Sequence, residues 1–273
     1  MAVSVIICFL EAMCNRTSKL LKAKVYNASR LARETETIVV RGDLRKYYRT
    51  ARAGQWYGGI ATADCCGCNL KCIFCWSGAP RDTPQKIGKF YSPEHIFNKL
   101  VNFAKKFGYT QLRVSGNEPT IGKLHLLRLL ELIDQTRYKF ILESNGTLIN
   151  AQYAKQLSKF KCIHVRISLK GTNREEFSLL TKAEGQAFDL QLNALKHLLD
   201  AGVSCHPAVM LSFSPKKNFT KLKTQLQEID TALAREVEEE YVFLYPHVVQ
   251  RLRNAGITPI VAYRPNNIPK ELI

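Results

Sequence analysis

The feature that most restricts the fold is a recurring joint: an amphipathic helix, then a glycine, then a short apolar strand. In "SPEHIFNKLVNFAKKFG", Ser92 and Pro93 are typical of a helix start, and Gly108 suits the left-handed residue that ends a helix. The strand "TQLRVS" follows directly. The joint recurs at Gly202, before "VSCHPAVML", and at Gly256, before "ITPIVAY". The pattern predicts strands that alternate with helices.

Three further stretches, "YGGIATA", "YKFILES" and "CIHVRISL", are apolar and β-branched, as strands buried on both faces should be. Another helix start is predicted at Thr172, with Glu175 completing a capping box. About six strand–helix units imply a parallel sheet with right-handed crossovers. Eight units would close a barrel, so six predict an α/β fold, either an open, partial (β/α)6 TIM-type barrel or a doubly wound sheet. We expect the partial barrel, with its ligands at the carboxyl ends of the strands.

The N-terminal part differs from the rest in charge. The stretches "NRTSKLLKAKVYNASRLAR" and "RGDLRKYYRTAR" are rich in Lys and Arg and poor in acidic residues. We interpret residues 1–55 as a basic N-terminal extension and residues 56–273 as one core domain. The whole chain carries a formal net charge of +17, which is consistent with a polyanionic partner or an acidic protein surface. The basic residues form either a solvated packing arm or a binding surface, in which Arg45, Lys46 and Arg49 would contact phosphates.

The cellular compartment is indicated by the cysteines and by the N-terminus. The chain has nine cysteines, and it has no recognisable secretory signal. The apolar stretch at residues 2–10 is too short to span a bilayer and lacks a preceding basic segment. We therefore expect a cytoplasmic protein without membrane association, whose thiols are reduced.

Three cysteines lie close together in "CNLKCIFC", at positions 68, 72 and 75. Disulfides are disfavoured in a reducing compartment. A zinc site could add Cys65, but only "NLK" would separate the two pairs, whereas zinc ribbons use about 15–20 residues. A redox pair would leave one cysteine unexplained. A cubane iron–sulfur cluster, whose usual ligands are thiolates, accounts best for the three.

The spacing Cys-x3-Cys-x2-Cys after a predicted strand resembles the radical S-adenosylmethionine superfamily, with a likeness that covers about residues 58–265. The resemblance implies an iron–sulfur oxidoreductase in which Cys68, Cys72 and Cys75 hold a [4Fe–4S] cluster. The iron without a cysteine ligand would then bind S-adenosylmethionine, whose reductive cleavage gives a 5′-deoxyadenosyl radical that abstracts hydrogen from the substrate.

The segment "RVSGNEPT" resembles the Gly-Gly-Glu-Pro segment of this family, with Asn117 in place of the second glycine. The resemblance implies that the Glu118 carboxylate pairs with the methionine ammonium group. Gly116 would let the backbone approach the ligand, and Asn117 tolerates the left-handed conformation that the turn would need. An ordinary strand-to-helix loop is the alternative interpretation.

Further cofactor contacts are implied at the ends of other strands. The aromatic position before the third cysteine and Met210 would lie near adenine, although both residue types are also common in cores. Ser168 and Lys170 would reach the ribose hydroxyls and the methionine carboxylate, unless the lysine faces solvent. The cofactor-binding candidates are Phe74, Gly116, Asn117, Glu118, Ser144, Asn145, Ser168, Lys170 and Met210.

The other cysteines do not extend the motif. Cys65 and Cys66 are expected to be small buried residues at the end of the strand. The remaining cysteines are scattered, which argues against a second cluster; they are Cys8, Cys14, Cys162 and Cys205.

With one motif and no appended cysteine-rich domain, the chain resembles the pyruvate formate-lyase activating enzyme branch, and archaeal iron–sulfur oxidoreductases of that kind. The resemblance implies a macromolecular substrate, in the first place a protein. A tRNA- or rRNA-modifying enzyme is the alternative that the charge favours. A non-catalytic electron-transfer protein is a third, against which Glu118 argues. Reduced ferredoxin or flavodoxin is the expected electron donor, and Cys205 or Tyr263 could quench the substrate radical.

Overall fold

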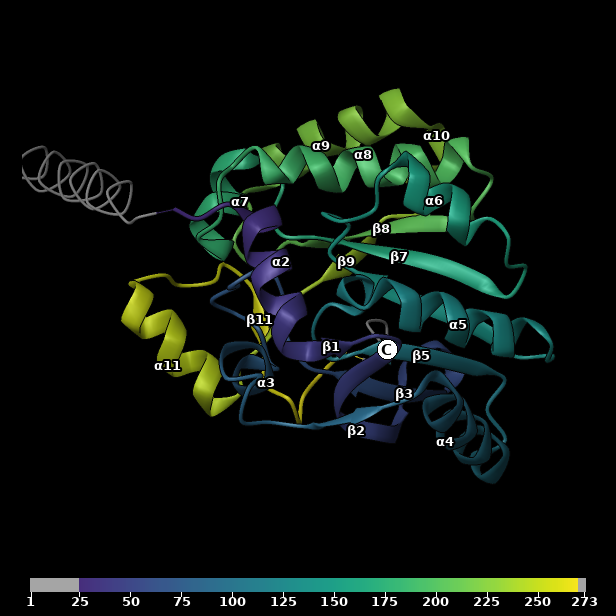
Figure 1. Cartoon of the computed structure of the whole chain (residues 1–273). Coiled ribbons are helices and arrows are strands. Elements are labelled where there is room, and N and C mark those ends of the chain that lie inside the picture. The colour runs from purple at the N-terminus through teal and green to yellow at the C-terminus, as the bar shows by residue number, and fades with distance from the viewer. Residues whose placement is uncertain (1–24, 270–273) are drawn as a thin grey trace, which may run out of the picture.

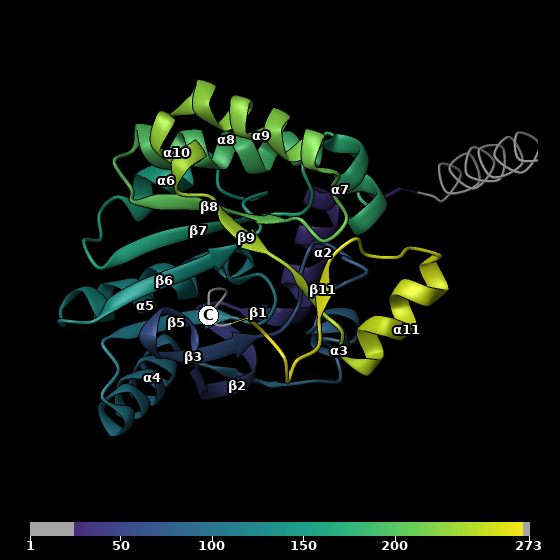
Figure 2. The same cartoon turned by 180° about the vertical axis from the view of Figure 1, so that it is seen from behind.

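The computed structural model describes residues 25–269 and contains a nine-stranded sheet. Six neighbouring strands of this sheet run parallel to one another. They are, in spatial order, β3 (Ile60–Cys65), β5 (Gln111–Ser115), β6 (Lys139–Ser144), β7 (Ile163–Leu169), β8 (Cys205–Met210) and β9 (Glu238–Glu240). The sheet curves into an open barrel, with helices around the outside (Figure 1; Figure 2). The predicted partial (β/α)6 barrel is therefore confirmed.

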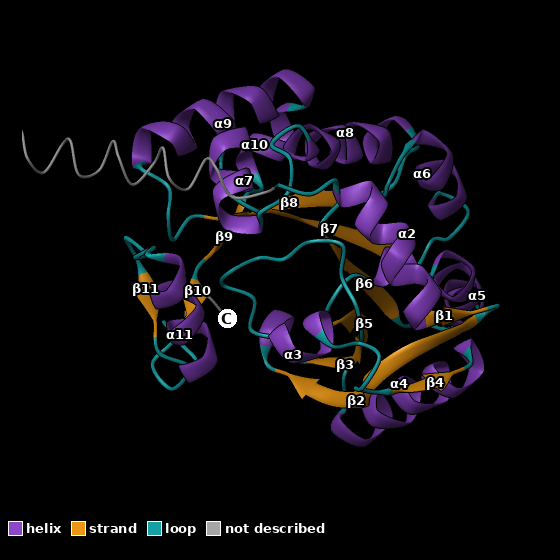
Figure 3. Cartoon of the chain, turned by 60° about the vertical axis from the view of Figure 1, so that its left-hand side comes forward, coloured by secondary structure: helices purple, strands orange, loops and turns teal. Residues whose placement is uncertain are grey.

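Seven helices follow the parallel strands and cover the outer face of the sheet (Figure 3). They are α4 (Pro93–Phe107), α5 (Lys123–Asp134), α6 (Ala151–Leu157), α7 (Arg174–Thr181), α8 (Ala187–Asp200), α9 (Lys216–Ile229) and α10 (Thr231–Arg235). The core lies between these helices and the sheet, because the outward side chains are apolar. On β7, for example, Val165, Ile167 and Leu169 are fully buried against the helices. The polar Arg166 and Ser168 alternate with them and face the inside of the barrel.

The predicted helix ends are confirmed in α4 and shifted in α7. Ser92 caps α4 by accepting a hydrogen bond from the His95 amide, and Gly108 ends the helix with φ 70°. In α7 the N-cap is Asn173, one residue later than the predicted Thr172. The reciprocal carboxylate is that of Glu176, which accepts from the Thr172 amide at 2.9 Å. The capping box was therefore predicted one residue too early.

The sixth parallel strand is not the one that the sequence predicted. The stretch "ITPIVAY" supplies only β11 (Ala262–Tyr263), which pairs with β10 (Val242–Phe243) in a separate two-stranded sheet (Figure 3). The sixth barrel strand is β9, whose sequence is Glu-Glu-Glu. An apolar pattern could not reveal β9, because two of its carboxylates are paired with Arg166 inside the barrel.

Much of the predicted basic extension belongs to the sheet. The helix α2 (Ala28–Val39) leads into β1 (Val40–Arg41) and β2 (Leu44–Gly54). β2 pairs antiparallel with β3 and also with β4 (Lys89–Tyr91). The boundary drawn between residues 55 and 56 therefore falls between two paired strands, separated by the short helix η1 (Trp56–Gly58).

Two of the three predicted phosphate contacts are wrong because these side chains are buried. Arg45 is 1% exposed and donates to the backbone carbonyls of Val39 and Glu118. Lys46 is 6% exposed and donates to the Gln85 carbonyl at 2.9 Å. Both cations serve to satisfy loop carbonyls.

Several expectations concern residues that the structure does not describe. Cys8, Cys14 and the apolar stretch at residues 2–10 lie outside the described range. Among the described helices, none combines the length and the apolar character needed to cross a membrane.

Candidate cofactor and substrate cavity

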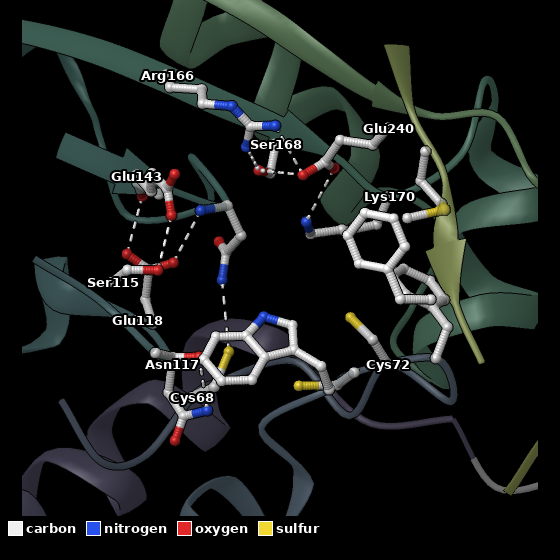
Figure 4. Close-up of a pocket in the computed structure, with 18 of the residues that line it drawn as sticks. Cys68, Cys72, Ser115, Asn117, Glu118, Glu143, Arg166, Ser168, Lys170 and Glu240 are labelled. Atoms are coloured by element: carbon white, nitrogen blue, oxygen red, sulfur yellow. Dashed lines mark hydrogen bonds and ion pairs between the residues drawn. The ribbon is translucent and has the colours of Figure 1, made fainter. Parts of the chain in front are cut away.

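A cavity of about 390 Å³ opens at the carboxyl ends of the parallel strands (Figure 4). All twelve site residues that the sequence predicted contribute to its wall. They are Cys68, Cys72, Phe74, Cys75, Gly116, Asn117, Glu118, Ser144, Asn145, Ser168, Lys170 and Met210. Segments spread over more than 140 positions of the sequence therefore meet around one space, as expected at this end of a barrel.

The three cysteines lie on the loop that follows β3, which we call the cysteine loop (residues 66–77). Two N–H groups point at the Cys68 sulfur: the Leu70 amide at 3.3 Å and the Asn145 side-chain amide at 3.7 Å. The Cys75 amide donates to the Cys72 carbonyl at 3.2 Å, which folds the loop into a turn. Such N–H contacts to sulfur are among the devices by which proteins set the potential of iron–sulfur clusters.

The thiols of the cysteine loop lie in a desolvated environment. Burial raises the pKa of Cys72 to about 11, and burial and the nearby Glu118 raise the pKa of Cys68 well above its usual range. Thiolates at these positions therefore need a positive partner, as cluster iron would provide. Three thiols around a cavity, with amide donors to one sulfur, fit an iron–sulfur cluster.

Cys65 and Cys66 are fully buried away from the cavity wall, as the sequence predicted. Cys65 belongs to the main hydrophobic core, and Cys66 packs with Val39 and Ile121 in a second, small cluster. Within residues 25–269, no three Cys, His, Asp or Glu side chains converge as a single metal ion requires. The zinc interpretation, which needed Cys65 beside the three loop cysteines, does not agree with this arrangement.

The glycine of "GNEPT" is required by its backbone conformation and by packing. Gly116 has φ 94°, and a Cβ there would lie 2.9 Å from both the Asp64 Cβ and the Cys65 carbonyl oxygen. Gly116 also lines the cavity, and its predicted role in letting the backbone approach a ligand stays a prediction. Among the described residues, left-handed backbone outside glycine occurs only at Tyr57 and Lys182. The expectation that Asn117 would need this conformation is therefore wrong.

Glu118 joins the ends of two strands. Its Oε1 accepts from the Thr120 hydroxyl at 2.6 Å and from the Ser144 hydroxyl at 2.8 Å. The Thr120 amide also donates to Oε1, at 3.1 Å, and the Asn145 amide donates to Oε2 at 2.8 Å. A carboxylate oxygen has two lone pairs, so Oε2 keeps one acceptor position for a ligand. Glu118 is 1% exposed, and a charge at this depth requires such partners.

The predicted ribose and carboxylate contacts lie at the end of β7, across the cavity from Cys68 and Cys72 (Figure 4). Ser168 accepts a hydrogen bond from Arg166 at 2.8 Å. The Lys170 ammonium lies 3.7 Å from Glu240 Oε2, and its side chain is only 16% exposed. The interpretation of Lys170 as a solvent-facing residue is therefore wrong.

The sequence interpretation missed a set of ion pairs inside the barrel. Arg113 on β5 pairs with Glu143 on β6 at 2.6 Å, and Arg166 on β7 pairs with Glu238 and Glu240 on β9 at 2.6 and 2.9 Å. Although burial alone raises the pKa of Glu143, Arg113 and Arg166 hold that pKa below its usual value. The sequence does indicate these pairs, because charged residues alternate with apolar ones in "LRVS", "ILES" and "VRIS". This alternation places the charged side chains on one face of each strand.

Two buried acceptors in the cavity wall have no hydrogen-bond partner among residues 25–269. They are Asn117 Oδ1 and Glu240 Oε2. Buried acceptors are rarely left unpaired, so their position fits a bound molecule with donor groups. S-adenosylmethionine offers an ammonium group and ribose hydroxyls, and it therefore fits this donor and acceptor set.

The proposed radical-quenching residues lie off the cavity wall. Cys205 is buried toward α8, with its sulfur 4.0 Å from the Leu195 carbonyl. Tyr263 packs edge-on against Tyr241 at 5.6 Å, and of the two only Tyr241 lines the cavity. The suggested quenching roles therefore have no geometric support.

The outer end of the cavity, which we call the mouth, is formed by its most exposed lining residues, Arg49, Trp76 and Glu239. Trp76 is 39% exposed, and the Arg49 side chain is 54% exposed. The Tyr241 hydroxyl donates to Glu239 at 2.6 Å.

Fold and cavity together define an α/β-barrel protein with a ligand site at the carboxyl ends of its parallel strands.

Comparison with protein families matches residues 64–220, more than half of the chain, to the model described as "Radical SAM superfamily". The chain belongs to the radical SAM superfamily. It is therefore an enzyme of the class that uses a [4Fe–4S] cluster and S-adenosylmethionine, as the sequence predicted.

Curated relatives resemble part of the chain. A "Probable GTP 3',8-cyclase" of Methanocella arvoryzae is 27% identical over 139 residues, which are 50% of this chain and 42% of that protein. A Fe-coproporphyrin III synthase of Methanosarcina barkeri is 29% identical over 141 residues, which are 50% of this chain and 32% of that protein. An uncharacterized protein of Methanocaldococcus jannaschii is 26% identical over 190 residues, which are 70% of this chain and 59% of that protein. The chain thus spans less than two thirds of the length of these relatives.

Solved structures show the same fold. A radical SAM methyltransferase from Sphaerobacter thermophilus has a TM-score of 0.55 at 14% identity, over 75% of this chain and 66% of that chain. SuiB from Streptococcus suis, bound to its precursor peptide SuiA, has a TM-score of 0.51 at 21% identity, over 60% of this chain and 35% of that chain. At these identities the likeness concerns the fold alone.

Proposed function

We propose that this chain cleaves S-adenosylmethionine reductively and abstracts a hydrogen atom from a substrate that enters at the mouth. The observation that carries the proposal is the meeting of Cys68, Cys72 and Cys75 with the segment of Glu118 around one cavity. The cluster and S-adenosylmethionine, when bound, supply the one-electron cleavage that yields a 5′-deoxyadenosyl radical. Reduced ferredoxin or flavodoxin is proposed as the electron donor.

The roles that we assign to the cavity residues follow from their contacts. Glu118 holds the loops after β5 and β6 together and offers its remaining Oε2 lone pair to the methionine ammonium group. Lys170, whose carboxylate neighbour lies beyond hydrogen-bond distance, is available for the methionine carboxylate. Phe74 and Met210 offer apolar surface to adenine on the same wall. Each role is a binding or orienting one.

For the substrate, we propose a protein segment. The mouth contains an exposed indole, a cation and a carboxylate, and a second cation, Arg52, lies 5.7 Å from the centroid of the Trp76 ring. This combination suits a peptide side chain held in an open groove. SuiB, which shares the fold, has been solved with a peptide. No named relative above is an activating enzyme, so the activase-like form of the proposal rests on the earlier resemblance alone. A nucleotide is the second candidate, favoured by the relatives named as GTP 3',8-cyclases.

The test is an anaerobic incubation of the reconstituted protein with dithionite and S-adenosylmethionine. Formation of 5′-deoxyadenosine that depends on Cys72 supports the proposal, with Cys72→Ala as the inactive control and Cys66→Ala as the matched active one. Deuterium transfer into 5′-deoxyadenosine from a labelled peptide or from labelled GTP identifies the substrate class. A wild-type protein that binds the cluster but never S-adenosylmethionine would favour the electron-transfer alternative.

A further inference from the structure

The cysteine loop is held from outside by two arginines that bind its carbonyl groups. Arg81, on α3 (Gly78–Asp82), donates to the Cys72 carbonyl. Arg251, on α11 (Pro246–Ala255), donates from Nε to the Ile73 carbonyl at 3.1 Å and from Nη2 to the Cys75 carbonyl. One side chain from the C-terminal part of the chain therefore bridges two carbonyls of the loop that carries the cysteines.

The helix α11 is built to present this arginine. Val248 and Leu252 are buried and seat the helix on the hydrophobic core. His247 Nε2 lies 2.8 Å from the Trp76 carbonyl, which adds a second tie to the end of the same loop. Position 78 is glycine, and a Cβ there would overlap the Arg251 guanidinium. The start of α3 thus leaves room for the Arg251 side chain.

The two arginines differ in their charge partners. Arg81 forms a fork with the Asp82 carboxylate, at 2.8 and 2.7 Å. Within residues 25–269, no carboxylate lies within ion-pair distance of Arg251. The guanidinium of Arg251 therefore has no directly paired carboxylate, although Asp82 is near enough to interact with it electrostatically. It lies beside a loop whose three cysteines become negative when they bind metal.

We propose that Arg251 is a positioning residue that fastens α11 to the cysteine loop and raises the reduction potential of the cluster held there. The inference rests on the proposed function, because it concerns a cluster bound by Cys68, Cys72 and Cys75. One-electron reduction adds negative charge to the cluster, and a nearby cation stabilises the reduced form. Hydrogen bonds and local charge are known determinants of such potentials.

The fastening is tested on the cluster-free full-length chain, through the alkylation rate of Cys75 with iodoacetamide followed by mass spectrometry. Arg251→Met should raise this rate several-fold, because the carbonyls of Ile73 and Cys75 lose their donors. Arg253→Met is the matched control, since Arg253 lies on the same helix and is exposed. Equal rates in the two variants would overturn the fastening.

The electrostatic part is tested by a redox titration of the reconstituted cluster, followed by electron paramagnetic resonance. Arg251→Met should lower the ratio of reduced to oxidised cluster at a fixed potential about tenfold, which corresponds to about 59 mV for one electron. Arg251→Lys keeps the charge and should lie closer to the wild type, and it also serves if Arg251→Met fails to fold. An unchanged ratio in Arg251→Met would overturn this part. A wild-type chain that binds no iron would instead refute the proposed function, while the alkylation result would still decide the fastening.

Discussion

Two walls of the same cavity were assembled from very different sequence material. The cofactor wall consists of the three cysteines of the cysteine loop and of the strand ends that carry Glu118, Asn145 and Lys170. The opposite part consists of the mouth, with Arg49, Trp76 and Glu239, and of the ion pairs inside the barrel. The first comes from short motifs whose residues lie next to one another in the sequence. The second comes from side chains that meet only after β2, β9 and the C-terminal segment have folded around the barrel.

The difference separates the part of the cavity that is shared with the family from the part that is particular to this chain. Residues 64–220 match the family and contain the whole cofactor wall, whereas β9 and the segment after it lie beyond that match. A substrate that touches the mouth therefore meets Arg49 and Glu239 outside the matched part, beside Trp76 within it. The cofactors thus follow from membership of the family, whereas the choice of substrate depends on residues particular to this chain.

The largest effect is expected for the three cysteines of the cofactor wall. Replacing Cys68, Cys72 or Cys75 by Ala should abolish the binding of about four irons per chain, because each thiolate is a ligand. Cys65→Ala and Cys66→Ala should retain the iron and lose only about 1 kcal/mol of unfolding free energy, since both lie in apolar clusters away from the cavity. Iron and sulfide analysis after anaerobic reconstitution decides. Iron loss in Cys65→Ala equal to that in Cys68→Ala would contradict the assignment.

On the opposite side, the ion pairs of Arg166 should matter for stability. Arg166→Met removes the arginine that pairs with both Glu238 and Glu240 at the inner face of the barrel, and leaves them only His206 and the more distant Lys170 ammonium. It should lower the free energy of unfolding by about 3 kcal/mol. Arg174→Met is the matched control, because that arginine is 59% exposed and its pair with Asp189 should contribute less than about 0.5 kcal/mol. Urea unfolding of both variants measures the difference. Similar losses would mean that the barrel pairs act like surface pairs.

The two carboxylates Glu118 and Glu143 sharpen the comparison within the barrel. Glu118→Ala should keep the cluster and weaken S-adenosylmethionine binding by about 1.5–3 kcal/mol, since it removes a charge-assisted pair and unties Ser144 and Asn145. Glu143→Gln should change this affinity less, because Glu143 contacts Arg113 and Ser115 instead. Calorimetric titration of the cluster-loaded variants provides the measurement. Unchanged binding in Glu118→Ala would remove Glu118 from the cofactor wall.

A buried histidine, His125 on α5, should make the free energy of unfolding depend on pH. Burial lowers the pKa of His125 to about 4, and its ring lies 2.8 Å from the Asp43 carbonyl and 3.0 Å from the Tyr47 hydroxyl. The unfolded chain takes up a proton below about pH 6.5 while the native ring stays neutral. The stability is therefore complete above pH 6.5 and is lost as the pH falls toward 4.

Between pH 7 and pH 5 the contribution of His125 to the free energy of unfolding should fall by about 2 kcal/mol. His125→Gln should flatten this dependence in urea unfolding, whereas His95→Gln, which changes an exposed ring, should not. A wild-type stability that stays constant over this range would contradict the neutral, buried state of His125.

The smallest effect is expected for RNA at the mouth. If RNA were the substrate, bulk tRNA should bind with a steep salt dependence, and Arg49→Glu should reduce the log–log slope by about one contact. We expect only feeble binding near physiological salt, because Arg45 and Lys46 are buried and cannot reach phosphates. Filter binding over a salt series tests this. Micromolar binding that persists near physiological salt would favour the RNA-modifying alternative.

The sequence predicted the parts of the molecule that depend on local chemistry. Cys68, Cys72 and Cys75 stand in one octapeptide, and Ser92 and Gly108 mark the ends of a helix through their own backbone preferences. The glutamates of β9 could not be assigned, because a run of three carboxylates becomes a strand only where Arg166 compensates its charge. Arg45 was predicted to be a surface cation, because the residues that bury it cannot be identified from the sequence. Its partners are the backbone carbonyls of Val39 and Glu118, and any residue type can supply a carbonyl.

The position of β9 at the end of the sheet has a consequence for the molecule among its own copies. In the described part of the chain, β9 pairs only with β8, so one of its edges keeps unpaired backbone groups. Such an edge can recruit another strand and start aggregation. Here every residue of the edge strand is a glutamate: Glu238 and Glu240 direct their carboxylates to Arg166 inside the barrel, and Glu239 is exposed. A short edge strand with inward-pointing charges is a poor template for a further strand, so an open barrel of this kind resists joining edge to edge.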